Sequence, residues 1–260
     1  MKARGLALVA VLLQFSAFGS GIVTNCTEEA LRGALVGGGT VTFDCDGIIA
    51  FSNTVDIVES TTLDASTRRV TISGGARVRL FNVAPGISLK LVNLTLADGA
   101  ASGVNAKESK EPPGFTSPEN AQGGAVAATN ATIVMQSCVV SNNIAKGGDS
   151  YLAAFLGFYS GGSESTGGAI ALHGGELEVS SSRFLQNVAE VPYGRDAGGM
   201  EFEAFGLARG GAIMVESCRV GIRNSTFEAN KAGTPGGGAI YAADSTVQVS
   251  VQTMSRPWAR

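Results

Sequence analysis

The chain has few charged residues and no long apolar run beyond its N-terminus. Charged residues make up 16% of its 260 residues, and the net charge is −3. This balance gives no electrostatic reason to expect a nucleic-acid partner. After residue 19 no stretch reaches the roughly 18 apolar residues of a transmembrane helix. We therefore expect no transmembrane segment in the mature chain.

Histidine and cysteine are also scarce, at one and four residues. No Cys-x-x-Cys or histidine-rich spacing suggests zinc, and we expect no metal and no cofactor. The lone histidine, His173, lies at the end of a predicted strand, and we interpret it as a solvent-facing turn residue. The acidic residues Asp44, Asp46 and Asp56 do not have the spacing of a known calcium loop.

The N-terminus predicts export. Lys2 and Arg4 precede an apolar core over residues 5–15, and Ala17-Phe18-Gly19 has the small-x-small pattern of a cleavage site. Residues 1–19 are thus interpreted as a secretory signal peptide; a buried first helix or strand is the alternative. Export predicts an extracellular or cell-surface location, including an outer membrane.

Glycine is abundant, at 36 residues, and it marks a repeat rather than a collagen period. A 19-residue spacing from Gly to Asn occurs three times, at Gly124–Asn143, Gly168–Asn187 and Gly211–Asn230. A fourth copy begins at Gly238. A supersecondary unit that recurs in register predicts a stacked β-solenoid.

Within each copy, apolar and polar residues alternate as in a half-buried strand. Stacking the copies about 4.8 Å apart would place like residues on like residues. This predicts an aromatic ladder, in which Phe184 and Phe227 are both buried and in contact, and an asparagine ladder. Asparagine tolerates left-handed backbone angles, so the asparagines suit one corner, and Gly-Gly suits another.

The region before the repeats reads as a cap followed by short strands. Residues 27–36 predict a helix with Thr27 as its N-cap, inside an N-terminal cap and first-coil region over residues 20–99. Residues 100–122 are polar and rich in proline, and are predicted to form a loop insertion; residues 123–260 hold the repeat. Predicted strands cover residues 40–43, 48–51, 54–58, 61–63, 70–73, 78–83 and 87–96.

Two of the four cysteines flank the predicted helix. Cys26 and Cys45 are the natural disulfide pair in an exported chain. Cys138 and Cys218 occupy different repeat positions two coils apart, which is beyond disulfide reach. We interpret these two as small buried or turn residues.

The motifs Gly167-Gly168-Ala169-Ile170 and Phe184-Leu185-Gln186-Asn187 recur with their equivalents in the following copies. This pair of motifs resembles the repeat of chlamydial polymorphic membrane proteins and of related right-handed β-helix proteins. The resemblance covers residues 123–254. It implies an all-β, right-handed parallel β-helix with an N-terminal helical cap. It also implies a non-catalytic, adhesin-like scaffold with a glycan or a host or cell-surface protein as its partner.

Two alternatives to the scaffold stay open. A polysaccharide-acting enzyme of the pectate-lyase kind would use outward side chains that the sequence does not single out. Glu176, Glu178 and Arg183 are outward positions, and we interpret their charges as solvated. An inert fragment of a longer surface protein would have no site at all. The fourth repeat places Pro257 where asparagine is expected, which favours a chain truncated at its C-terminus.

The candidate binding residues lie in two aromatic insertions that follow Asn143 and Asn187. Both insertions leave the solenoid at the same corner, so we expect their bases to lie side by side and the loop over residues 100–122 to join them. An exposed aromatic surface suits a glycan or protein partner. The alternative is that these rings fold onto the outer wall of the solenoid. The candidates are Tyr151, Phe155, Phe158, Tyr159, Tyr193, Phe202 and Phe205.

Cleavage after Gly19 should give a mature chain that begins at Ser20, because the small-x-small pattern ends there. N-terminal sequencing of exported protein tests this directly. Exported material that still begins at Met1 would contradict the signal-peptide interpretation.

Overall fold

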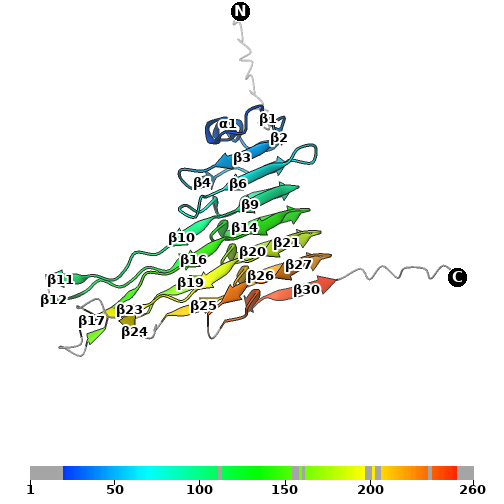
Figure 1. Cartoon of the computed structure of the whole chain (residues 1–260). Helices are drawn as coiled ribbons and strands as arrows, with labels where there is room; N and C mark the ends of the chain where they lie inside the picture. The colour runs from blue at the N-terminus through cyan, green and yellow to red at the C-terminus, as the bar shows by residue number, and fades with distance from the viewer. Residues whose placement is uncertain are drawn as a thin grey trace, which may run out of the picture.

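The computed structural model describes residues 20–110, 113–153, 158–159, 162–196, 201–202, 206–233 and 236–250. The predicted signal peptide lies outside the described residues. The described part is mostly β-structure, arranged in parallel sheets with one N-terminal helix (Figure 1). No helix in these ranges is long and apolar enough to cross a membrane.

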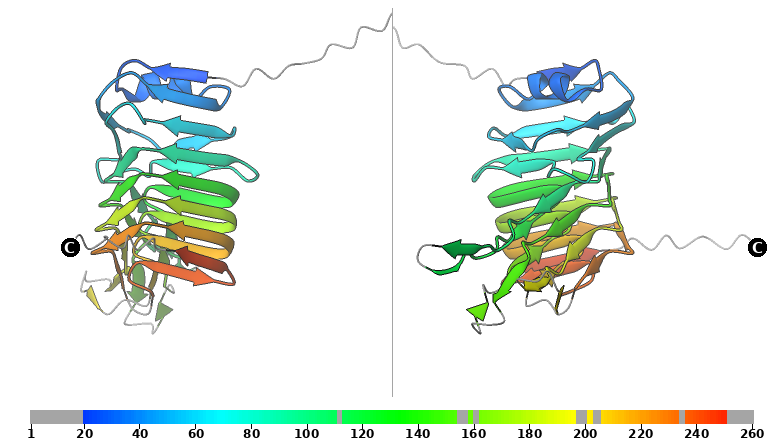
Figure 2. Two further views of the ribbon diagram at one scale, coloured as in Figure 1. Left: turned by 90° about the vertical axis from the view of Figure 1, so that its right-hand side faces the viewer. Right: turned by 60° about the vertical axis from the view of Figure 1, so that its left-hand side comes forward.

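The largest sheet, called the main sheet, has eleven strands that pair in parallel. Most of them lie one above another from the N-terminal to the C-terminal end of the molecule (Figure 2). Its strands are β1 (Ser20–Val23), β2 (Gly39–Phe43), β4 (Val55–Ile57), β5 (Thr61–Asp64), β7 (Phe81–Val83), β8 (Ser88–Val92), β14 (Val126–Gln136), β20 (Ile170–Ser180), β26 (Ile213–Arg223), β29 (Ile240–Ala243) and β30 (Thr246–Ser250).

Three further parallel sheets follow the same stacking direction. The second sheet contains β3 (Gly47–Ala50), β6 (Val70–Ser73), β9 (Leu94–Ala97), β15 (Val139–Ser141), β21 (Arg183–Leu185) and β27 (Thr226–Glu228). The third contains β10 (Ala100–Ser102), β16 (Ile144–Lys146), β22 (Val188–Glu190) and β28 (Lys231–Ala232). The fourth contains β13 (Ala121–Gln122), β19 (Glu164–Thr166) and β25 (Leu207–Arg209).

The chain visits these sheets in a fixed order. From β14 it runs through β15, β16 and β19 and returns to the main sheet at β20; the next stretch repeats this order through β21, β22 and β25 to β26. We call each such stretch a pass. One continuous apolar core, with Ile133, Val140 and Phe184 fully buried, joins residues of the main and second sheets.

The predicted register between the repeats is confirmed. Val126 pairs with Ile170, Ile170 with Ile213, and Ile213 with Ile240. The predicted alternating segment of each copy lies within one continuous strand of 11 residues, in β14, β20 and β26. Each bends at a left-handed residue, namely Asn130, Gly174 and Ser217.

The asparagine ladder is present, but its conformation differs from the prediction. The left-handed residues at this corner are Asn142, Gln186 and Ala229, each directly before a ladder asparagine. The ladder residues contribute hydrogen bonds instead. Asn143 Nδ2 donates to Asn187 Oδ1 at 2.9 Å, and Asn187 Nδ2 donates to Asn230 Oδ1 at 2.8 Å.

The Gly-Gly corner depends on both glycines for different reasons. The first glycine is left-handed, with φ of 55° at Gly123 and 58° at Gly167. The second lies against the neighbouring pass: a Cβ added to Gly168 would lie 2.1 Å from the Gly211 carbonyl oxygen. Any larger residue there would force the passes apart.

The aromatic ladder brings Phe184 and Phe227 into contact. Their rings stack with centroids 4.8 Å apart and planes 8° apart. Phe184 is fully buried, whereas Phe227 is only half-buried. The expectation that both rings are buried is therefore wrong for Phe227.

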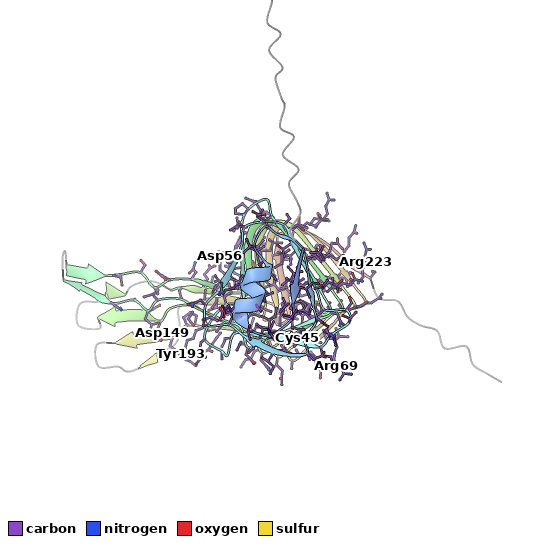
Figure 3. All side chains as sticks on the ribbon, turned by 90° about the horizontal axis from the view of Figure 1, so that it is seen from above. Cys45, Asp56, Arg69, Asp149, Tyr193 and Arg223 are labelled. Atoms are coloured by element: carbon purple, nitrogen blue, oxygen red, sulfur yellow. A yellow bond between two sulfur atoms is a disulfide. The ribbon has the colours of Figure 1, made fainter. Side chains whose placement is uncertain are left out.

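The helix α1 (Glu28–Ala34) covers one end of the core (Figure 3). Thr27 Oγ1 accepts a hydrogen bond from the Ala30 N–H at 3.2 Å. Glu28 and Glu29 lie in the first turn, where their negative charges interact favourably with the helix dipole. Leu31 is fully buried beneath the helix. The helix and its N-cap thus match the prediction, whereas β1 before it was not predicted.

A disulfide joins Cys26 and Cys45, whose Cα atoms are 5.7 Å apart. It links the entry of α1 to the end of β2 and so ties the cap to the first strands. Cys138 and Cys218 are free and buried. Burial raises the pKa of both thiols above the ordinary value, so neither is prepared to act as a thiolate.

Two sequence predictions for the region before the repeats need correction. The predicted strand over residues 87–96 is broken into β8 and β9 at Asn93, which has φ of 54°. Residues 100–122 are not a plain loop, because they contribute β10 and β13 to the third and fourth sheets. They also form a hairpin of β11 (Glu108–Lys110) and β12 (Pro113–Phe115).

Phe184→Ala should lower the free energy of unfolding by about 3–5 kcal/mol, as for a fully buried aromatic side chain. Phe227→Ala should lower the free energy of unfolding by less, because the ring is already partly exposed to solvent. Denaturant titration of both variants measures the difference. Equal decreases in the free energy of unfolding would contradict the difference in burial between the Phe184 and Phe227 rings.

Candidate binding surface

Three insertions leave the stack at the same corner and form one projection, called the arm. They run from Ala100 to Gln122, from Ile144 to Thr166 and from Val188 to Arg209. Figure 3 shows them extending to one side of the main body. The expectation that their bases lie side by side is confirmed by the pairing of Ala100 with Ile144 and of Ile144 with Val188.

The inner part of the arm has two thin layers, made by the third and fourth sheets. The side chains between them are small: Ala101, Ala121 and Ala145 form a separate buried cluster. Ser165, which pairs with Ala121, is also fully buried. Alanine and serine allow two β-layers to approach closely where larger side chains would not fit.

Side chains also connect successive insertions through hydrogen bonds to the backbone. Asn105 Oδ1 accepts from the Asp149 N–H at 2.8 Å, and Asp149 Oδ1 accepts from the Tyr193 N–H at 3.0 Å. Asn120 Oδ1 accepts from the Glu164 N–H at 2.8 Å. The sequence analysis missed these residues, although Asn105 and Asp149 share the 44-residue spacing of Gly124 and Gly168.

The outer part of the arm is a set of hairpins. The second insertion pairs β17 (Ser150–Ala153) with β18 (Phe158–Tyr159), and the third pairs β23 (Gly194–Asp196) with β24 (Glu201–Phe202). Parallel pairing of β17 with β23 joins them into one four-stranded sheet. Sequence reasoning placed the aromatic insertions together but did not predict these strands.

Five of the seven predicted aromatic residues lie within the described part of the chain. Tyr151, Phe158, Tyr159 and Phe202 belong to this four-stranded sheet. Tyr193 lies just before β23 and is 42% exposed. Phe155 and Phe205 lie outside the described residues.

Tyr193 has a charged neighbour on the same surface. Lys146 Nζ lies 5.1 Å from the centre of the Tyr193 ring and 3.1 Å from Glu190 Oε1. Lys146 thus combines a cation–π contact with an ion pair. This cluster of Lys146, Glu190 and Tyr193 comes from the second and third insertions and marks where they meet.

Arg79 binds the backbone at the end of the first insertion, on the N-terminal side of the arm. Its Nε donates to the Gly123 carbonyl at 3.0 Å, and its Nη2 donates to the Gln122 carbonyl at 2.8 Å. These carbonyls lie where the first insertion returns to the stack. Burial lowers the pKa of Arg79 below its ordinary value, and the charge of Asp56 opposes the shift.

Two glycines, Gly233 and Gly236, allow the backbone to pack against the third insertion on the C-terminal side of the arm. After β28 the chain returns to the main sheet without an insertion and passes against the third insertion. A Cβ added to Gly233 would lie 1.7 Å from Val191 Cγ2, and one added to Gly236 would lie 2.1 Å from the Ala208 carbonyl oxygen. Only glycine fits this close approach.

The other candidates from the sequence lie away from the arm tip. His173 belongs to β20 rather than to a turn, is half-buried, and has Nδ1 3.0 Å from Glu216 Oε2. Glu176 and Glu178 are half-buried, whereas Arg183 is exposed. No group of three or more His, Cys, Asp or Glu residues able to hold a metal occurs within the described ranges.

The contacts of Arg79 predict a local effect of its removal. Arg79→Leu should weaken the return of the first insertion, because two carbonyls lose a charged donor worth about 1.5–3 kcal/mol. Hydrogen exchange should accelerate around Gln122 and Gly123. Arg77→Leu is the matched control, since the Arg77 side chain is exposed and donates no hydrogen bond in the described part, and its backbone N–H bond to the Gly74 carbonyl would remain. Equal exchange in both variants would contradict the role of Arg79.

Comparison of the chain with protein-family models, with curated proteins and with solved structures gives no match. One fold supports many functions, so the residues and the geometry of the arm, and not the fold, indicate what this chain does.

Proposed function

We propose that the protein is a secreted or cell-surface scaffold that binds a glycan or a protein through its arm, and that it acts without catalysis. The stack is then a right-handed parallel β-helix of the polymorphic-membrane-protein type. Its arm presents the hairpins at a fixed distance from the stack. The observation that carries the proposal is the parallel pairing of β17 with β23, which joins two insertions into one surface.

The proposed handedness follows from the order in which the chain visits the sheets. Each pass connects parallel strands of the same sheet through strands elsewhere, as from β14 to β20. Connections of this kind are right-handed in about 98% of cases. The recurrence of the same order in successive passes extends the argument from one connection to the whole stack.

The proposed export is supported by two separate features. The first is the basic, apolar and small-residue order of residues 1–19. The second is the disulfide between Cys26 and Cys45, a type of bond that persists in oxidising compartments. Together they favour an extracellular or cell-surface location.

A binding role for the arm is favoured because ordering its residues costs conformational entropy. Fixing the backbone of each residue costs about 1–2 kcal/mol, and the arm adds little to the main core. Specific contacts such as Asp149 to Tyr193 and Lys146 to Glu190 nevertheless hold its insertions in register. A surface fixed in this way can bind without a further ordering cost.

Deletion of residues 151–159 should weaken binding to immobilised glycans or to cells, because it removes one half of the four-stranded sheet at the arm tip. The far-ultraviolet circular dichroism spectrum should stay nearly unchanged, since the stack does not depend on the tip. Glycan-array binding and whole-cell binding measure the loss.

The chain supplies its own control for this deletion. Residues 231–237 return from the asparagine corner to the main sheet without an insertion. Replacing residues 144–167 and 188–210 by this segment should remove the second and third insertions, which form the four-stranded sheet, and keep the passes. Unfolding of the 151–159 deletion would show that the arm has a structural role. Unchanged binding would contradict the arm as the site and direct attention to Glu176, Glu178 and Arg183.

A further inference from the structure

An Asn-x-Thr triplet lies on the strand face of the stack, away from the arm. Asn130-Ala131-Thr132 belongs to β14 and has the acceptor pattern of N-linked glycosylation. Asn130 is exposed and left-handed, with φ of 49°, so it lies at the bend of this strand. Its Nδ2 makes no hydrogen bond within the described part of the chain.

The surroundings of Asn130 are unusually open for a stacked sheet. Neighbouring passes are about 4.8 Å apart, so a sugar on one strand collides with side chains at the same position on the next strand. Asn130 has glycine on both sides. The Gly86 N–H donates to the Asn130 carbonyl at 2.7 Å, and Gly174 is at the equivalent position in the next pass.

Both glycines leave room above the sheet. A Cβ added to Gly86 would meet no atom within 4 Å. A Cβ added to Gly174 would lie 2.2 Å from Asn130 Oδ1, so the amide occupies the space that a side chain would need. A surface depression of about 460 Å³ is lined by Gly86, Asn130, Thr132 and Gly175 among others. Asn130 and Thr132, the first and third residues of the triplet, thus line one open site.

Three other triplets of this pattern begin at Asn25, Asn93 and Asn224. Asn93 uses its Nδ2 to donate to the Ala65 carbonyl at 2.8 Å, which holds its turn in place. In the first triplet, Cys26 is in the disulfide and Thr27 caps α1. Asn224 is also exposed. Asn130 combines exposure with an amide nitrogen that makes no hydrogen bond among the described residues and with glycine neighbours on both sides.

We propose that Asn130 is an acceptor for N-linked glycosylation in the secretory pathway. The donor is a lipid-linked oligosaccharide diphosphate. Asn130 Nδ2 forms a bond to the anomeric carbon of the first sugar, the bond from that carbon to the phosphate oxygen breaks, and the amide loses one proton. The inference depends on the proposed export, because the donor is confined to that pathway. The glycan would cover the strand face and leave the arm as the free surface.

The test is secretion of the chain from a eukaryotic cell, once with residues 1–19 and once behind an established secretory leader. Peptide mass spectrometry of medium and lumenal fractions should find a glycan at Asn130. Asn130→Gln and Thr132→Ala should lose it, whereas Thr132→Ser, which retains the hydroxyl, should keep it. Unmodified Asn130 in chain that entered through the established leader would overturn the proposal.

The same experiment separates this proposal from the proposed export. A chain that enters the pathway only behind the established leader would contradict export by residues 1–19 and would still report on Asn130. Thermal unfolding provides a second readout. The glycosylated chain and the same chain after enzymatic removal of the glycan should unfold at the same temperature, because the site is open. Destabilisation by the glycan would contradict the clearance provided by Gly86 and Gly174.

Discussion

The carboxamide of Asn187 holds three successive passes together, and the rest of the structure depends on this contact. Its Oδ1 accepts from the Asn143 N–H at 3.1 Å and from Asn143 Nδ2 at 2.9 Å. Its Nδ2 donates to the Val140 carbonyl at 2.9 Å and to Asn230 Oδ1 at 2.8 Å. Because Asn187 is fully buried, a shift of one pass by one residue would leave these polar groups unpaired. Each unpaired buried group costs about 1–3 kcal/mol, so the ladder fixes the register.

The arm takes its order from this corner. The second and third insertions begin directly after the ladder residues Asn143 and Asn187, so Ile144 and Val188 start in register before any arm contact forms. The same kind of bond then recurs farther out, where the side chains of Asn105 and Asp149 accept from the backbone of the following insertion. The stack and the arm are thus ordered by the same kind of bond, in which a side-chain oxygen of one pass accepts a backbone N–H of an adjacent pass.

The sequence was sufficient to predict what the repeat dictates. Ile170 and Ile213 could be aligned because each falls two residues after a Gly-Gly pair, and the stack pairs them. The left-handed residues Gln186 and Ala229 could not be predicted, because neither favours that conformation; the neighbouring asparagine and the stacked strands impose it. Likewise the strands within residues 100–122 are too short to show periodicity, and they exist because Ala100 and Ala121 pair with the next insertion.

The fourth connection shows that the arm and the stack are separable. From Asn230 to Gly238 the chain returns to the main sheet in eight residues, and Gly211 still donates to the Gly238 carbonyl at 3.1 Å. A pass thus keeps its register without any insertion. The identity of the arm residues is therefore constrained by contacts within the arm, and the ladder residues by contacts within the stack. Changes at the arm tip can alter recognition while the hydrogen bonds of Asn143 and Asn187 stay as they are.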